Sequence, residues 1–100
     1  MISGKAKELF LKWFRKEKLL NGFDKKPIYT QFFLLCEWFK IKGYAISVTS
    51  SYYNSNYTAK ISFNQVDIMT ASEDSLEKIY IVAIEYANRE FNDRFSETDG

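Results

Sequence analysis

The spacing of apolar residues predicts a helix at the start of the chain. From Ser3 to about Leu20, apolar residues recur at helical spacing and share one face, while lysines and an arginine occupy the opposite face. Asn21 and Gly22 come next, and both tolerate the left-handed backbone conformation that commonly ends a helix. The predicted apolar face consists of Ala6, Leu9, Phe10, Trp13, Phe14 and Leu20.

A second helix is predicted from Pro27 to about Lys42, with its end at Gly43. Proline suits the first turn of a helix, where its missing N–H costs no hydrogen bond. This helix carries two apolar stripes, separated by polar residues, so we expect it to be sandwiched between other elements. The first stripe consists of Ile28, Phe32, Leu35, Cys36 and Phe39, and the second consists of Leu34, Trp38 and Ile41.

After Gly43 the apolar pattern changes to an alternation, which is typical of half-buried strands. Residues 44–49 and 57–63 both alternate, and Asn54-Ser55-Asn56 between them suits a turn, so the two segments predict an antiparallel β-hairpin. Near residues 64–65 the alternation slips by one position. Such a slip indicates a bulge or a short third strand.

A third helix is predicted after Thr70-Ala71-Ser72-Glu73, which fits a capping box, with Asp74 adding favourable negative charge. It should run to about Asp93 with its core face on Leu76, Ile79, Tyr80, Ala83, Ile84, Ala87 and Phe91. The predicted fold is therefore α+β, in the order α-α-β-β-α, with a short antiparallel hairpin packed against helices. We expect one domain over residues 1–95 and a frayed tail over residues 96–100.

Composition favours a small folded domain in a reducing compartment. Of 100 residues, 46% are apolar and 18% are aromatic, which is enough to build a core and leave apolar surface over. Cys36 is the only cysteine, so no intrachain disulfide can form. No secretory signal is recognisable, and every apolar run, such as residues 32–36, is far too short to cross a bilayer. These features predict a cytoplasmic protein without a membrane partner.

The absence of histidine argues against most enzymatic functions. It excludes Ser-His-Asp and Cys-His nucleophilic sites and removes the commonest ligand of zinc and iron. All four glycines are isolated, so the chain has no glycine-rich phosphate loop. Paired carboxylates such as Glu73 with Asp74 lie near predicted helix ends, where capping and solvation explain them. We therefore predict no catalytic residue, no metal site, no cofactor and no enzymatic activity.

Charge is distributed unevenly along a nearly neutral chain of net charge +1. Residues 1–26 hold eight Lys or Arg against three Asp or Glu, whereas residues 67–100 hold three against nine. The basic first helix and the acidic last helix could lie side by side within one molecule. Alternatively, each could serve a separate contact, including head-to-tail self-association.

Two surfaces are predicted to bind a protein partner. The hairpin tip is almost entirely Tyr, Ser, Thr and Asn, a composition typical of adaptable binding surfaces, although an exposed hairpin needs many of the same residues. The second stripe of the second helix must be covered by the first helix or else form an oligomer or partner interface. The predicted partner-binding residues are Tyr52, Tyr53 and Tyr57 at the tip and Leu34, Trp38 and Ile41 on the stripe.

The alternative partner is nucleic acid, which the basic residues near the start of the chain could contact along its phosphate backbone. Trp13 and Phe14 are residue types that stack on bases, but they lie on the apolar face expected to join the core. A solvated lysine-rich helix face is also common. The candidate residues are Lys5, Lys12, Arg15, Lys16, Lys25 and Lys26.

Two segments, residues 35–44 and 75–87, resemble small uncharacterised proteins of phages and mobile elements. In those proteins a Trp-containing helix leads into a hairpin, and a terminal helix follows a short acidic cap. The resemblance implies no activity, because such proteins share no assigned chemistry, but it does imply a viral accessory role such as occupying the surface of a host protein. The sequence thus predicts a non-enzymatic protein-binding or self-associating accessory module, including a homodimer.

Overall fold

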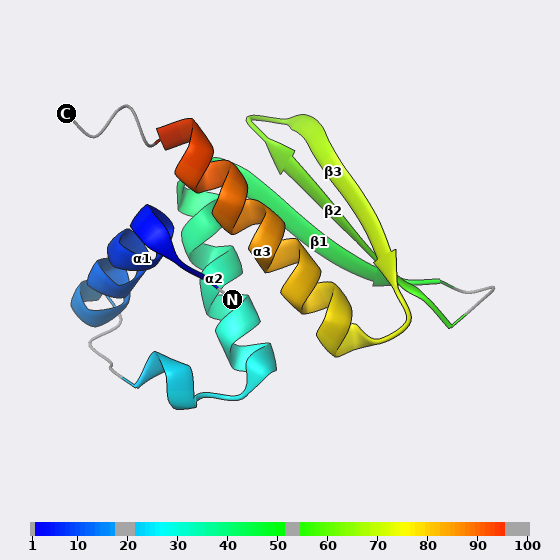
Figure 1. Cartoon of the computed structure of the whole chain (residues 1–100), viewed down its shortest axis with the longest axis horizontal. Coiled ribbons are helices and arrows are strands. Elements are labelled where there is room, and N and C mark those ends of the chain that lie inside the picture. Colours follow the sequence, from blue (N-terminus) through cyan, green and yellow to red (C-terminus); the bar gives the residue numbers. More distant parts are fainter. Residues whose placement is uncertain (1, 18–21, 52–54, 96–100) are drawn as a thin grey trace.

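The computed structural model describes residues 2–17, 22–51 and 55–95. The described residues form three α-helices and one three-stranded antiparallel sheet (Figure 1), so the predicted α+β class is confirmed. A third strand makes the observed order α-α-β-β-β-α instead of the predicted α-α-β-β-α. The elements are α1 (Gly4–Glu17), a 3-10 turn η1 (Phe23–Lys25), α2 (Ile28–Ile41), β1 (Tyr44–Ser50), β2 (Tyr57–Phe63), β3 (Val66–Glu73) and α3 (Leu76–Phe95).

The helices α2 and α3 cover one face of the sheet, whose strand order is β1-β2-β3. Tyr44 of β1 contacts both helices, since its ring lies 5.7 Å from that of Phe39 on α2 and 6.5 Å from that of Phe91 on α3. Helix α1 packs on α2 and α3 rather than on the sheet (Figure 1). The molecule is therefore layered, with α1 outermost on the helical side.

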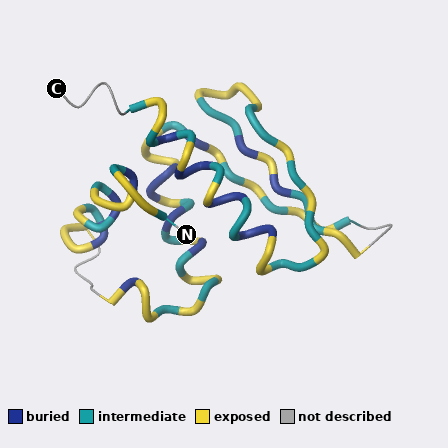
Figure 2. The backbone as a smooth tube through the Cα atoms, in the orientation of Figure 1, coloured by how far each residue is buried: buried dark blue, intermediate teal, exposed yellow. Residues whose placement is uncertain are grey.

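Aromatic rings fill the space between these layers. Trp38 on α2 is only 1% exposed and contacts Phe10 on α1 and Phe91 on α3, with ring centroids 5.9 and 5.1 Å away. Figure 2 shows buried positions on all three long helices and on β2, whereas β3 has none that is fully buried. Most of the aromatic side chains thus pack in or against one core.

Helix α2 is sandwiched as its two apolar stripes predict. The sheet lies under one side, and α1 covers the second stripe through the contact between Phe10 and Trp38. Leu34 is half-buried against the core, while Ile41 is 60% exposed. The stripe therefore does not form the exposed patch that would arise if α1 packed elsewhere, and Trp38 is not available to a partner.

The third strand accounts for the slip of the apolar pattern. Asn64 and Gln65 adopt positive φ angles of 49° and 71°, which allows a tight turn between β2 and β3. Ile61 pairs with Met69 and Ser62 pairs with Asp67, so Ile68 is the extra residue of a bulge. The alternatives of a bulge and a third strand thus both occur, because the bulge lies inside the strand.

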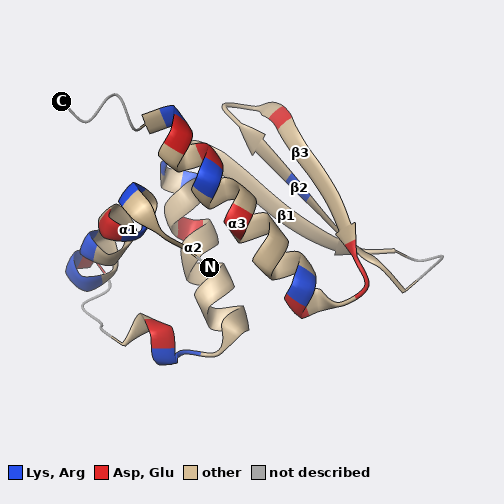
Figure 3. Cartoon of the chain, in the orientation of Figure 1, with Lys and Arg blue, Asp and Glu red and all other residues tan. Residues whose placement is uncertain are grey.

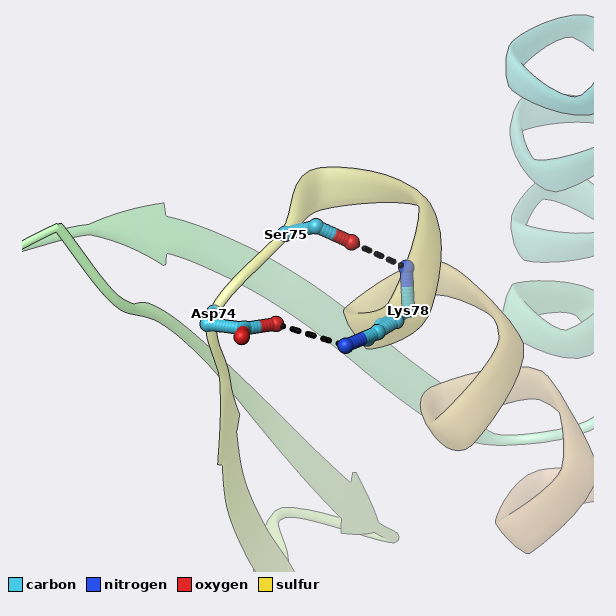
Figure 4. A network of polar contacts seen from close by, with 3 residues as sticks. All are labelled: Asp74, Ser75 and Lys78. Carbon is cyan, nitrogen blue, oxygen red and sulfur yellow. Dashed lines mark hydrogen bonds and ion pairs between the residues drawn. The ribbon is translucent and has the colours of Figure 1, made fainter.

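The start of α3 differs from the prediction. The segment Thr70–Glu73 belongs to β3, and the cap is Ser75, whose hydroxyl accepts the backbone N–H of Lys78 at 3.1 Å (Figure 4). Asp74 lies just before the helix and forms a 3.0 Å ion pair with the Lys78 ammonium. These residues form strand rather than a helix cap because Thr70 and its neighbours pair with β2.

Polar side chains of α3 hold the start of α1. The Asn92 side-chain oxygen accepts the backbone N–H of Ala6 at 2.8 Å, and its amide donates to the Ser3 carbonyl at 3.0 Å. Asn88 accepts the Ser3 backbone N–H at 2.8 Å, and the Lys5 ammonium donates to the Phe95 carbonyl at 2.9 Å. The first helix therefore does lie against the last helix, but the contacts use neutral groups of α3. Helix α3 holds four acidic residues against three basic ones, so most of the acidic excess of residues 67–100 lies outside it.

Candidate functional site

The outer edge of β1 presents unpaired backbone groups. At its two ends, Gly43 accepts a hydrogen bond from the N–H of Asn64 and Ser51 donates to the carbonyl of Asn56. In an antiparallel ladder, the direction of the backbone groups alternates along the strand, so the odd-numbered residues of β1 bond to β2. The N–H and C=O groups that point away from the sheet belong to Tyr44, Ile46, Val48 and Ser50.

This edge has none of the features that usually protect an exposed strand. Residues 44–50 contain no charge and no proline, their ladder with β2 has no register shift, and no other described strand pairs with them. The opposite edge, β3, is protected in several ways. It contains a bulge and the acidic residues Asp67 and Glu73, and the carbonyl of Ile68 accepts the Tyr86 hydroxyl at 3.1 Å. The two edges are thus unequal, and β1 is the one that is open to another strand.

A partly apolar groove of about 480 Å³ runs beside the open edge. Its α2 wall includes Phe33, whose side chain is 64% exposed, and its strand wall includes Ala45 and Ile46, which point to opposite faces of the sheet. A groove that reaches both residues must lie along the edge itself. The lining residues are Phe33, Cys36, Glu37, Lys40, Tyr44, Ala45 and Ile46.

Cys36 contributes apolar surface to this groove rather than reactivity. Burial raises the pKa of its thiol to about 12, well above its ordinary value of 9.0. The thiol therefore stays protonated at neutral pH, and the thiolate that would act as nucleophile or metal ligand is scarcely populated. Burial thus makes Cys36 part of the apolar wall of the groove.

The outer face of the sheet, which the helices leave uncovered, carries mostly small polar side chains. Thr58 and Ser72 exchange a hydrogen bond of 3.1 Å between their hydroxyls across β2 and β3, and Lys60 forms a 3.0 Å ion pair with Asp67. On β1 this face presents only Ala45, Ser47 and Thr49. A strand that extends the sheet beyond β1 would therefore need small polar residues on this side.

The predicted hairpin-tip site is only partly visible. Tyr52 and Tyr53 lie outside the described residues. Tyr57 begins β2, where it is half-buried and packs against the core. Its ring thus contributes to the packing of the core.

The basic residues are spread over α1 and the η1 region (Figure 3). Arg15 and Lys25 line a shared depression of about 220 Å³, but the acidic Asp24 lines it as well. The Lys5 ammonium is engaged by the Phe95 carbonyl. The other candidates do reach the surface: Lys12, Lys16 and Lys25 are exposed and Lys26 is half-buried.

The sequence pattern did not lead us to predict a binding role for Phe33 or for the open edge of β1. Phe33 lies outside both apolar stripes of α2, and that position was the available signal, because an apolar residue on the polar side of a helix needs its own explanation. Tyr29, one turn earlier, is 45% exposed, but its ring packs against that of Tyr80 on α3, with centroids 5.4 Å apart. The edge could not be recognised without the strand order, which decides whether β1 is central or peripheral.

Two absences among the described residues concern metal ligands and membrane-spanning helices. Among residues 2–17, 22–51 and 55–95, no three His, Cys, Asp or Glu side chains lie close enough together to hold a metal ion. Within the same ranges no helix combines the length and the apolar character needed to cross a bilayer.

Comparison of the chain with models of protein families, with curated proteins and with solved structures finds no match. The resemblance to phage proteins stays a prediction.

Proposed function

We propose that this protein is a non-enzymatic protein-binding module, and that its partner adds an extended strand to the open edge of β1. The observation that carries this proposal is the contrast between the two sheet edges. The edge of β3 is bulged and charged, whereas the edge of β1 is regular and uncharged and lies beside a groove.

Strand addition uses two kinds of contact. Main-chain hydrogen bonds to Tyr44, Ile46 and Val48 supply affinity without depending on the partner's sequence. Alternate side chains of the added strand then enter the groove between α2 and β1, where Phe33 and Cys36 favour apolar groups. The remaining side chains lie on the small polar face of the sheet, so the partner should alternate apolar and small polar residues.

The resemblance to phage proteins extends this proposal to the biological role. A viral accessory module that occupies a host protein needs an interface and no catalytic machinery. Nucleic-acid binding has less support than strand addition, since the depression shared by Arg15 and Lys25 is also lined by the acidic Asp24 and the chain as a whole is nearly neutral.

Site-specific photo-crosslinking tests the proposed function. A benzoylphenylalanine placed at Ser47, on β1, should crosslink to a protein in the cells that naturally make this chain. The same group at Thr70, an exposed position on β3, is the matched control and should give no such product. Crosslinking at both positions alike, or at neither, would overturn the proposal.

A further inference from the structure

The chemistry of the open edge defines what can occupy it. The strand of residues 44–50 is uncharged, so an occupant with no charge of its own avoids burying an unpaired ion. It must place apolar side chains toward α2 and small polar ones on the outer face of the sheet. It must also be about as long as β1, so that each outward backbone group is paired.

Residues 44–50 themselves meet these requirements. Tyr44, Ile46 and Val48 point toward the helices, whereas Ala45, Ser47 and Thr49 point to the outer face. From this match we infer that the occupant is a second copy of this chain, whose β1 pairs antiparallel with β1 across a two-fold axis. This inference rests on the proposed strand addition at β1 and names the partner.

One register satisfies the geometry best. With the two-fold axis at Ser47, Tyr44 pairs with Ser50 of the second copy and Ile46 with Val48 of the second copy, and the reverse pairs follow by symmetry. Every residue with outward backbone groups then exchanges hydrogen bonds with an equivalent group. Any shift along the strand leaves end residues unpaired, so this register joins the two three-stranded sheets with the fewest unsatisfied groups.

The helical side of the proposed interface is also self-complementary. Phe33 on α2 is 64% exposed and lines the same groove as Ile46, one residue from the proposed axis. A two-fold axis at Ser47 therefore brings the exposed apolar residues of both α2 helices toward each other. Their burial adds hydrophobic stabilisation that the backbone hydrogen bonds do not provide on their own.

Electrostatics does not oppose this association. Each chain carries a net charge of only +1, and the paired strands are uncharged. The groove wall bears one acidic and one basic residue, Glu37 and Lys40, so two copies meet without an excess of either sign.

Light scattering after gel filtration tests the association of the purified chain. The expected mass is twice 11.8 kDa. Val48→Pro, which removes an outward N–H but leaves the ladder with β2 intact, should return the mass to that of one chain. The matched control is Thr70→Pro, because the ladder between β2 and β3 directs the Thr70 N–H outward at the other edge, and it should leave the mass of the dimer unchanged.

A disulfide test fixes the register and does not depend on a disruptive variant. On a Cys36→Ser background, Ser47→Cys places two thiols at the axis in a non-hydrogen-bonded pair, where Cα atoms lie about 4.5 Å apart and a disulfide fits. Mild oxidation should link the copies almost completely. Thr49→Cys alone should link poorly, because it faces Ala45 of the second copy.

The outcomes separate the two proposals. A purified chain that has the mass of one copy at every concentration, with Ser47→Cys that does not link, overturns self-pairing. If the photo-crosslinker at Ser47 then captures another protein, strand addition stands with a different occupant. If it captures none, the proposed function fails as well.

Discussion

The hydroxyl of Tyr86 on α3 donates a 3.1 Å hydrogen bond to the backbone carbonyl of Ile68 on β3. Ile68 is the bulge residue, whose backbone groups leave the ladder with β2. The Tyr86 hydroxyl thus supplies a hydrogen-bond donor to a carbonyl that has none in the ladder, and it links β3 to α3. No equivalent contact with β1 occurs in the described part of the chain.

Tyr86→Phe should lower the free energy of unfolding by about 1 kcal/mol, since it leaves the Ile68 carbonyl without its hydroxyl donor. Chemical denaturation measures this change, and hydrogen exchange of β3 should accelerate more than that of β1. Equal acceleration in both strands would show that the hydroxyl does not act locally on the bulge.

Asn92→Ala should destabilise the protein by about 1–2 kcal/mol, because the Ala6 N–H loses the acceptor that plays the role of a helix cap. Asn92→Asp keeps an acceptor near the start of α1 and should cost less, although it loses the donor to the Ser3 carbonyl. Denaturation of both variants gives the comparison. An equal loss in the two variants would contradict the capping role.

Trp38→Ala should cost about 3–5 kcal/mol, since the indole is buried among Phe10, Phe39 and Phe91. Ile41→Ala, on the same stripe but 60% exposed, should change the free energy of unfolding of the monomer by no more than about 0.5 kcal/mol. Thermal or urea unfolding distinguishes them. Similar effects at the two positions would mean that the stripe is not divided between core and surface.

Alkaline pH should destabilise the fold through Tyr44. Burial, and secondarily the negative charge of Glu90, raise the pKa of its hydroxyl from 10.0 to about 12. The folded state therefore holds this proton more tightly than the unfolded state, so the contribution is complete below pH 10 and is lost between pH 10 and 12.

The Tyr44→Phe variant is the control for this pH dependence. It should remove a loss on the order of 2 kcal/mol between pH 10 and 12 and change the stability little at pH 7. Unfolding curves across this range measure the difference. An unchanged alkaline slope in Tyr44→Phe would assign the loss to another group.

Much of the fold could be predicted because the local spacing of apolar residues indicates which side chains are buried. The spacing of Phe10 and Phe14, the two stripes of α2 and the alternation of residues 44–49 each matched an element. The prediction of where α3 starts was wrong for a physical reason. Thr70–Glu73 suits both a capping box and a strand, and only pairing with β2 decided between them.

The candidate site could be predicted less well than the fold. Trp38 was a reasonable candidate for an interface, but its availability depended on where α1 packs. Phe33 stood outside both stripes and could have been recognised as exposed. Tyr52 and Tyr53 lie outside the described residues, so their role stays a prediction.

The sequence by itself determined most of the helical and strand segments, though not the end of β3, and which faces of them are apolar, because these properties depend on neighbours a few residues apart. Only the tertiary structure decided that β1 lies at an edge, that β3 is protected by its bulge and Tyr86, and that α1 covers Trp38. Each of these facts depends on contacts between segments far apart in the chain, which local periodicity does not record. The open edge of β1, and the partner proposed for it, follow from that tertiary order.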